Sequence, residues 1–132
     1  MKIDGQLERG LVHEISVVAT EAQTAHAVGN TGVHVVATIF MIGFIEECCG
    51  WLVYPYLAEH EVSVGTHVNV HHRAAVEPGK PLSVTAELVE IDGAQLTFES
   101  SVSHGGTVLM TGTHQRRIIP VARLKPRVTQ GV

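Results

Sequence analysis

The stretch TIFMIGFIEECCGWLVYPYL, residues 38–57, decides the fold because it holds the longest periodic pattern in the chain. Apolar residues recur at spacings of three and four, which is typical of one face of a helix. They are Phe40, Met41, Phe44, Ile45, Cys48, Cys49 and Leu52. Ile39, Ile42 and Trp51 widen this stripe until it nearly surrounds the element, which predicts a buried helix. Pro55 falls near the end, where helices usually break.

The sequence on both sides of this helix alternates between apolar and polar residues, as strands do. One strand is expected at residues 10–19, before a loop that ends at Gly29–Gly32. The others are expected at residues 62–75, 82–91, 96 to about 103, and 107–119, with turns at 77–81, 92–93 and 104–106. This order predicts an α+β fold in which one antiparallel sheet packs its concave face on the long helix.

Length and composition define the class of protein. The chain has 132 residues, which is enough for a single domain spanning residues 1–132. Nine basic against thirteen acidic residues give no basic patch for nucleic acid. The mean hydropathy of +0.20 and the exposed edges of an open sheet favour a homodimer, or a tetramer built from it.

The sequence carries no sign of export, of a membrane span or of a metal site. Met1–Gly5 lacks an apolar run, and the apolar stretch 35–45 ends at Glu46-Glu47, short of the ~20 residues that a spanning helix needs. The two cysteines are adjacent, so they form neither a disulfide framework nor a zinc spacing. The nine histidines show no His-x-x-x-His pair on the expected helix. We therefore expect a cytoplasmic protein without metal, cofactor or membrane contact.

His72 is the most informative polar residue of the expected strand 62–75. Strict alternation places it on the same face as Val68 and Val70, toward the core, with His67 and His71 on the opposite face. A buried imidazole needs a partner for its ring nitrogens. His72 is thus a candidate for chemistry, and the alternative is a structural histidine bonded to a backbone carbonyl.

Two helix residues could meet that histidine. Thr38 and Glu46 lie on the same side of the helix, about 12 Å apart along its axis. A base, an orienting group and a hydroxyl on one inward surface are the parts of an activated nucleophile. The alternatives are a helix cap for Thr38 and a solvated carboxylate for Glu46. Gly65 could offer its backbone N–H to an oxyanion, or could be a bulge or turn glycine.

Four motifs together resemble the hotdog-fold thioesterases, most closely the fluoroacetyl-CoA thioesterase group. They are Thr38-x-x-x-x-Gly43-x-x-Glu46, Gly65-Thr66, His72, and Gly112-Thr113-His114-x-Arg116. The resemblance covers nearly the whole chain. It implies a curved antiparallel sheet wrapped around one long helix, a dimer with active sites at the subunit interface, and hydrolysis of an acyl-CoA thioester.

The resemblance also implies a role for each residue. Thr38, Glu46 and His72 correspond to a Thr–His–Glu catalytic site. The amide of Gly65 corresponds to the donor near the thioester oxygen, and Arg116 to an arginine near the substrate entrance. Whether water, Thr38 or Glu46 attacks the thioester stays open. Candidates for binding the CoA phosphates are Arg73, Lys80, Arg116 and Arg117.

One segment departs from the group, which has phenylalanines before the helix that form a lid over the fluorinated acyl group. Residues 27–36 of this chain contain no aromatic residue, and we assign no role to His34 within them. A broader or different acyl group is therefore expected.

Two other functions are compatible with the same fold. One is a protein that binds acyl-CoA or a small ligand without turnover. The other is an enoyl-CoA hydratase, but that group uses an Asn-Pro-x-His sequence, and this chain has no Asn-Pro dipeptide.

Overall fold

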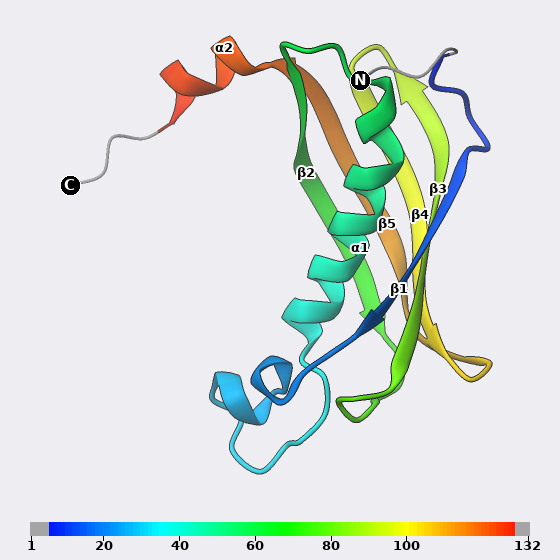
Figure 1. Cartoon of the computed structure of the whole chain (residues 1–132), viewed down its shortest axis with the longest axis vertical. Helices are drawn as coiled ribbons and strands as arrows, with labels where there is room; N and C mark the ends of the chain where they lie inside the picture. Colours follow the sequence, from blue (N-terminus) through cyan, green and yellow to red (C-terminus); the bar gives the residue numbers. More distant parts are fainter. Residues whose placement is uncertain (1–5, 129–132) are drawn as a thin grey trace.

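A computed structural model describes residues 6–128 as five antiparallel strands and one long helix (Figure 1). The strands are β1 (Val12–Val18), β2 (Glu61–His72), β3 (Pro81–Asp92), β4 (Gln95–His104) and β5 (Thr107–Pro120), and their order in the sheet is β1-β3-β4-β5-β2. The helices are α1 (Thr38–Val53) and α2 (Val121–Leu124), with short 3₁₀ turns at Glu21–Gln23, His26–Val28, Tyr54–Tyr56 and Lys125–Arg127. The predicted α+β arrangement is confirmed.

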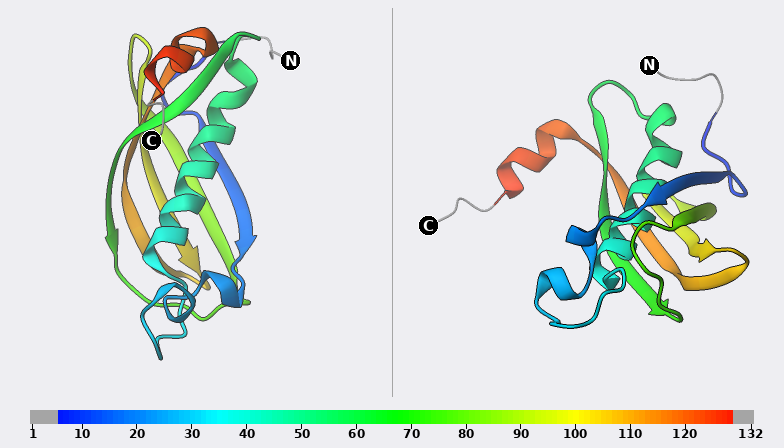
Figure 2. Two further views of the ribbon diagram at one scale, coloured as in Figure 1. Left: turned by 90° about the vertical axis from the view of Figure 1, so that its left-hand side faces the viewer. Right: turned by 60° about the horizontal axis from the view of Figure 1, so that its bottom comes forward.

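The core lies between α1 and the concave face of the sheet (Figure 2). The apolar stripe predicted for the helix supplies its side of the core, with Met41, Ile45 and Cys48 fully buried. The sheet contributes the inward residues of β3, β4 and β5: Leu82, Val84, Ala86, Leu88, Leu96, Phe98, Val102 and Met110. Burying one such aliphatic or aromatic side chain contributes about 1.5–3 kcal/mol, so this contact fixes where α1 lies on the sheet.

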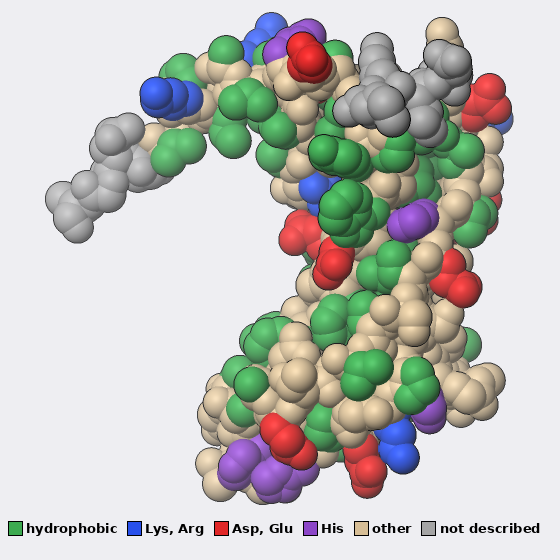
Figure 3. Space-filling view, viewed as in Figure 1, with side chains coloured by type: hydrophobic (Ala, Val, Ile, Leu, Met, Phe, Trp, Pro, Cys, Tyr) green, Lys and Arg blue, Asp and Glu red, His purple; other side chains and the backbone are tan. Residues whose placement is uncertain are grey.

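The opposite face of α1 is uncovered, and here the expectation of a helix buried all round is wrong. Ile39 is 59% exposed and Trp51 51%, and Tyr54, in the turn directly after the helix, is 57% exposed. A single sheet can cover only one side of a helix, so the remaining apolar side chains gather on the surface over α1 (Figure 3). The helical stretch Thr38–Tyr56 is also long and apolar enough to cross a membrane, but its buried residues pack on the sheet as those of a core helix do.

Strand β2 contains an irregularity that strict alternation did not predict. The register with β5 shifts between Gly65 and His67, so that Thr66 is an extra residue, as in a β-bulge. Before the bulge, Ser63 and Gly65 pair with the inner-face residues of β5; after it, Val68 does. Strict alternation along residues 62–75 would place Val62 and Val64 on the inner face with His72, but the bulge places them on the outer face.

The close pairing of β2 and β5 gives a first prediction. A Cβ added to Gly112 would lie 2.8 Å from Val70 Cα and would also meet the carbonyl oxygen of Asn69. Because these are backbone atoms of the paired strand, we expect Gly112→Ala to lower the free energy of unfolding by about 1–3 kcal/mol. Urea unfolding at one protein concentration measures the change.

The control is Thr113→Ala, the next residue of the same strand, which should unfold within about 0.5 kcal/mol of the wild type. Equal urea midpoints for Gly112→Ala and the wild type would contradict this prediction. They would show that β2 and β5 move apart enough to accommodate the added methyl group at no cost in stability.

Candidate active site

Thr38 and His72 are in direct contact. Thr38 is the first residue of α1, and its Oγ1 lies 2.7 Å from Nδ1 of His72, the last residue of β2. The helix cap is Ala37, and no side chain caps this end, so the interpretation of Thr38 as a cap is wrong. In the tautomer protonated at Nε2, the hydroxyl donates to Nδ1, the arrangement in which an imidazole can remove a proton from an alcohol.

His72 lies on the predicted face but is not buried. It pairs with Met110, which is fully buried, so both side chains lie on the inner face of the sheet. However, β2 is an edge strand and ends where α1 begins, and the ring of His72 is exposed. We expected aliphatic residues to enclose the imidazole of His72. This expectation is wrong for the single chain, in which the ring is exposed.

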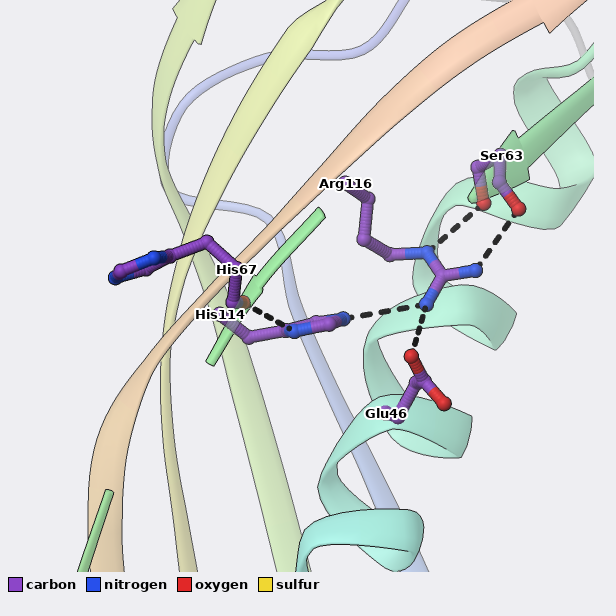
Figure 4. Close-up of polar contacts among 5 residues, drawn as sticks. All are labelled: Glu46, Ser63, His67, His114 and Arg116. Carbon is purple, nitrogen blue, oxygen red and sulfur yellow. Dashed lines mark hydrogen bonds and ion pairs between the residues drawn. The ribbon is translucent and has the colours of Figure 1, made fainter. Parts of the chain in front are cut away.

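Glu46 lies in a second cluster, farther along α1. Its side chain is 52% exposed, and Oε2 is 3.8 Å from Nη1 of Arg116 in β5 (Figure 4). The carboxylate is also so close to Gly65 that a Cβ on this glycine would collide with Oε2. Gly65 therefore lets the carboxylate approach the β2 backbone, and it also borders the bulge at Thr66, in agreement with the alternative of a bulge glycine.

Arg116 is nearly buried, at 9% exposure, and its guanidinium is held on three sides. Nε donates to Oγ of Ser63 at 2.9 Å, and Nη2 donates to the Ser63 carbonyl oxygen at 2.9 Å. Nη1 lies 3.2 Å from Nε2 of His114, and the same nitrogen faces Glu46. These contacts favour a role in holding Glu46 over binding of a CoA phosphate.

His114 is a member of this cluster whose role sequence reasoning missed. It is 1% exposed, and Nδ1 lies 3.0 Å from the carbonyl oxygen of His67. A carbonyl only accepts, so Nδ1 carries the proton and Nε2 accepts from Arg116. Burial, and then the nearby Arg116 charge, lower the pKa of His114, which is consistent with a neutral ring. The sequence contained an indication of this position, because alternation along residues 107–119 places His114 on the same face of the strand as Met110 and Arg116.

The two clusters are separate within one chain. Thr38 and Glu46 lie about 12 Å apart along α1, because each helical residue adds 1.5 Å. Each has its own partners: His72 for Thr38, and Arg116 for Glu46. The three residues expected to act together thus occupy one surface of the chain without meeting.

A groove lies beside the Glu46 cluster. It has a volume of about 310 Å³ and is formed by the C-terminal half of α1, the turn after it, the start of β2, and Arg116. Its lining residues are Glu47, Gly50, Trp51, Tyr54, Leu57, Glu61, Val62, Ser63 and Arg116. Within residues 6–128, no three His, Cys, Asp or Glu side chains gather as a metal site would require.

The cysteines beside the cluster do not provide a nucleophile. Cys48 and Cys49 are free and buried. Burial is the main cause that raises the pKa of Cys48 to about 11 and that of Cys49 to about 12. The reactive thiolate is therefore scarce near neutral pH.

Comparisons with known proteins place this chain in a family. The family model for the fluoroacetyl-CoA-specific thioesterase matches residues 19–122. The chain belongs to this thioesterase family. A fluoroacetyl-CoA thioesterase from Streptantibioticus cattleyicolor is 38% identical over 96 residues, which cover 73% of this chain and 69% of that protein.

Solved structures agree with this assignment. A phenylalanine-to-alanine variant of the fluoroacetyl-CoA-specific thioesterase, in complex with fluoroacetate and CoA, is 31% identical, with a TM-score of 0.84 over 89% of this chain and 99% of that chain. A hot-dog-like protein from Thermanaerovibrio acidaminovorans is 17% identical, with a TM-score of 0.84 over 94% of each chain, and shows the fold alone. The predicted hotdog fold and the predicted class of enzyme, a thioester hydrolase, are confirmed.

The environment of His114 predicts how stability of this thioesterase depends on pH. Its pKa is lowered in the folded chain, so the unfolded chain binds more protons below about pH 6.5. The His114 contribution is therefore present above pH 6.5 and is lost as the pH falls from there toward the folded pKa. Thermal unfolding from pH 8 to pH 5 measures this loss.

The control is His114→Gln, which cannot take up this proton. Its melting temperature should fall less than that of the wild type over the same pH range. Parallel curves for the two proteins would show that His114 titrates alike in the folded and unfolded chains.

Proposed function

We propose that this thioesterase hydrolyses a small acyl-CoA thioester at a site shared by two protomers of a homodimer. One protomer supplies Thr38 and His72, and its partner supplies Glu46 and Gly65. The observation that carries the proposal is the 2.7 Å contact between Thr38 and His72 at a solvent-exposed position, while residue Glu46 lies about 12 Å farther along the axis of the same helix, with Arg116 as its partner.

A two-fold pairing of the α1 helices would join the two clusters. In an antiparallel pair, Thr38 of one protomer lies beside Glu46 of the partner subunit when the two-fold axis passes near residue 42. The next residue is Gly43, which is exposed and has no atom within 4 Å of an added Cβ. A glycine at this point allows two helices to approach closely.

The uncovered surfaces also favour a dimer. The exposed face of α1 carries Ile39 and Trp51, and Tyr54 lies exposed just after the helix. The surface is hollowed beside α1, below α2 (Figure 3). Val68 lies on the inner face of the edge strand β2, yet it is 42% exposed. Apolar side chains and an open strand edge on one side of a chain are the features that a second copy would cover.

The chemistry follows from the groups that would meet. His72 acts as the base and takes a proton from the attacking oxygen, either that of Thr38 or that of a water molecule. Glu46 of the partner subunit stabilises the imidazolium or activates the water. The Gly65 N–H donates to the oxyanion of the tetrahedral intermediate. His72 then returns the proton to the departing CoA thiol. If water attacked, the acid is released at this step; if Thr38 attacked, a water molecule deprotonated by His72 then cleaves the acyl ester on Thr38, the proton returns to the Thr38 oxygen, and the acid is released.

The acyl group is set by the segment before α1. Residues 27–36 carry no Phe, Tyr or Trp side chain, and the ring of His34 stacks on His26, so this segment before α1 offers less bulk than a phenylalanine lid would. We propose that acyl groups of a few carbons are accepted alongside or instead of fluoroacetyl. We also propose a cytoplasmic location, since the adjacent Cys48 and Cys49 are free thiols.

The first test is hydrolysis. We expect the wild type to release CoA thiol from at least one member of a panel of fluoroacetyl-, acetyl-, propionyl- and butyryl-CoA. His72→Ala and Glu46→Ala should each lower kcat by about 10²–10⁴-fold, because each removes a proton-transfer or charge-stabilising group. A thiol-specific chromophoric reagent measures the release.

The control is His71→Ala, the exposed neighbour on the opposite face of β2, which should keep the wild-type rate. No release of thiol by the wild type from any member would favour the binding protein without turnover. Equal rates in the wild type and both site variants would remove these residues from the mechanism.

The second test asks whether two protomers share the site. His72→Ala and Glu46→Ala chains, each inactive alone, are co-expressed with different tags, and the mixed dimer is purified. A shared site leaves one intact site in each mixed dimer, so about half of the wild-type activity should return. A site built from one chain leaves none intact, and an inactive mixed dimer would contradict the shared site.

A further inference from the structure

We propose that His114 is a positioning residue that orients Glu46 for catalysis by holding the guanidinium of Arg116. This rests on the proposed role of Glu46 in thioester hydrolysis. His114 is buried on the inner face of the sheet, and its ring and the Glu46 carboxylate approach the same Arg116 nitrogen from different sides (Figure 4). It would therefore act through Arg116.

His114 is itself rigidly held. It lies on β5 with its ring stacked near that of Phe98, at a centroid distance of 6.2 Å and an interplanar angle of 28°. The Nδ1–H donates to the His67 carbonyl, beside the bulge in β2. The backbone of one strand and the core thus fix both the plane and the tautomer of the ring.

The fixed ring determines which way Arg116 points. Ser63 holds Nε and Nη2, so the guanidinium can still tilt about the edge that faces Ser63. The Nη1 nitrogen is the one that faces Glu46, and its contact with His114 Nε2 at 3.2 Å restrains this tilt. If Nε2 could not accept, the N–H of Arg116 Nη1 that points at His114 would be buried without a hydrogen-bond partner. The guanidinium would then rotate until this N–H reached another acceptor.

Only the neutral ring can do this. The charged and titratable groups around His114 are Arg116 on its own strand, His67 on β2, and Glu46 on α1, with the buried thiol of Cys49 beside Arg116. An imidazolium would present an N–H donor to the Arg116 N–H and place two positive charges together. Its protonation would release Arg116 and with it the orientation of Glu46.

Two matched substitutions separate the contacts of the ring. His114→Gln places an amide near the Nε2 position and can still accept from Arg116. His114→Asn places its amide near Nδ1 and can still donate to His67, but it does not reach Arg116. We expect His114→Asn to lower kcat about ten- to hundred-fold with little change in KM, and His114→Gln to keep most of the kcat.

A double-mutant cycle distinguishes positioning from general stability. In an Arg116→Met background, His114→Asn should lower kcat no further, because Arg116 is the route through which His114 acts. A merely structural histidine would give losses that multiply. Circular dichroism and the melting temperature check that each variant is folded before its kcat is compared.

Three results would overturn the proposal. One is a wild-type kcat for His114→Asn, another is multiplicative losses in the cycle, and the third is a ring protonated at Nε2. The ¹⁵N signals of the ring nitrogens report the tautomer without any assay of activity. A wild type that hydrolyses no acyl-CoA would instead overturn the proposed function, and the catalytic role of His114 with it, while the tautomer would still test the geometry.

Discussion

The contact between one face of α1 and the concave face of the sheet determines every other feature of this thioesterase. Met41, Ile45 and Cys48 are buried against the sheet, so the helix can neither rotate nor slide without exposing them. This places Thr38 at the end of β2, against His72. It also leaves Glu46 on the side of the helix that faces β2 and Arg116. The same helix therefore supplies both the core and two residues of the candidate site.

The bulge in β2 makes the second cluster possible. With unbroken alternation from His72 backwards, Ser63 and Gly65 would point away from the helix. The extra residue at Thr66 turns them inward, where Ser63 holds two nitrogens of Arg116 and Gly65 makes room for Glu46. A local irregularity of one residue thus links the carboxylate on α1 to the arginine on β5.

Local sequence patterns predicted the elements and failed where the structure depends on more than one element. The three- and four-residue spacing of residues 38–57 and the alternation of the strands reflect burial, so they predicted α1, the five strands and the inner face of His72. The bulge leaves no such pattern, because it changes the register between two strands. The exposure of Ile39 and Trp51 was also missed. In a sequence, apolar residues that a single chain leaves exposed to solvent have the same pattern as apolar residues of the core. His114 gave a correct face, but its bonds to His67 and Arg116 join strands that are distant in sequence.

The two cysteines of α1 give the fold a chemical reporter of its own. Cys48 points its thiol at the carbonyl oxygens of His13 and Val84, between β1 and β3, and Cys49 is equally buried. An alkylating reagent meets these thiols only when the helix lifts from the sheet, and then it meets two at once. The rate of alkylation under native conditions therefore reports how often α1 separates from the sheet. The frequency of core opening can thus be measured at the natural cysteines, without a substitution that introduces a new one.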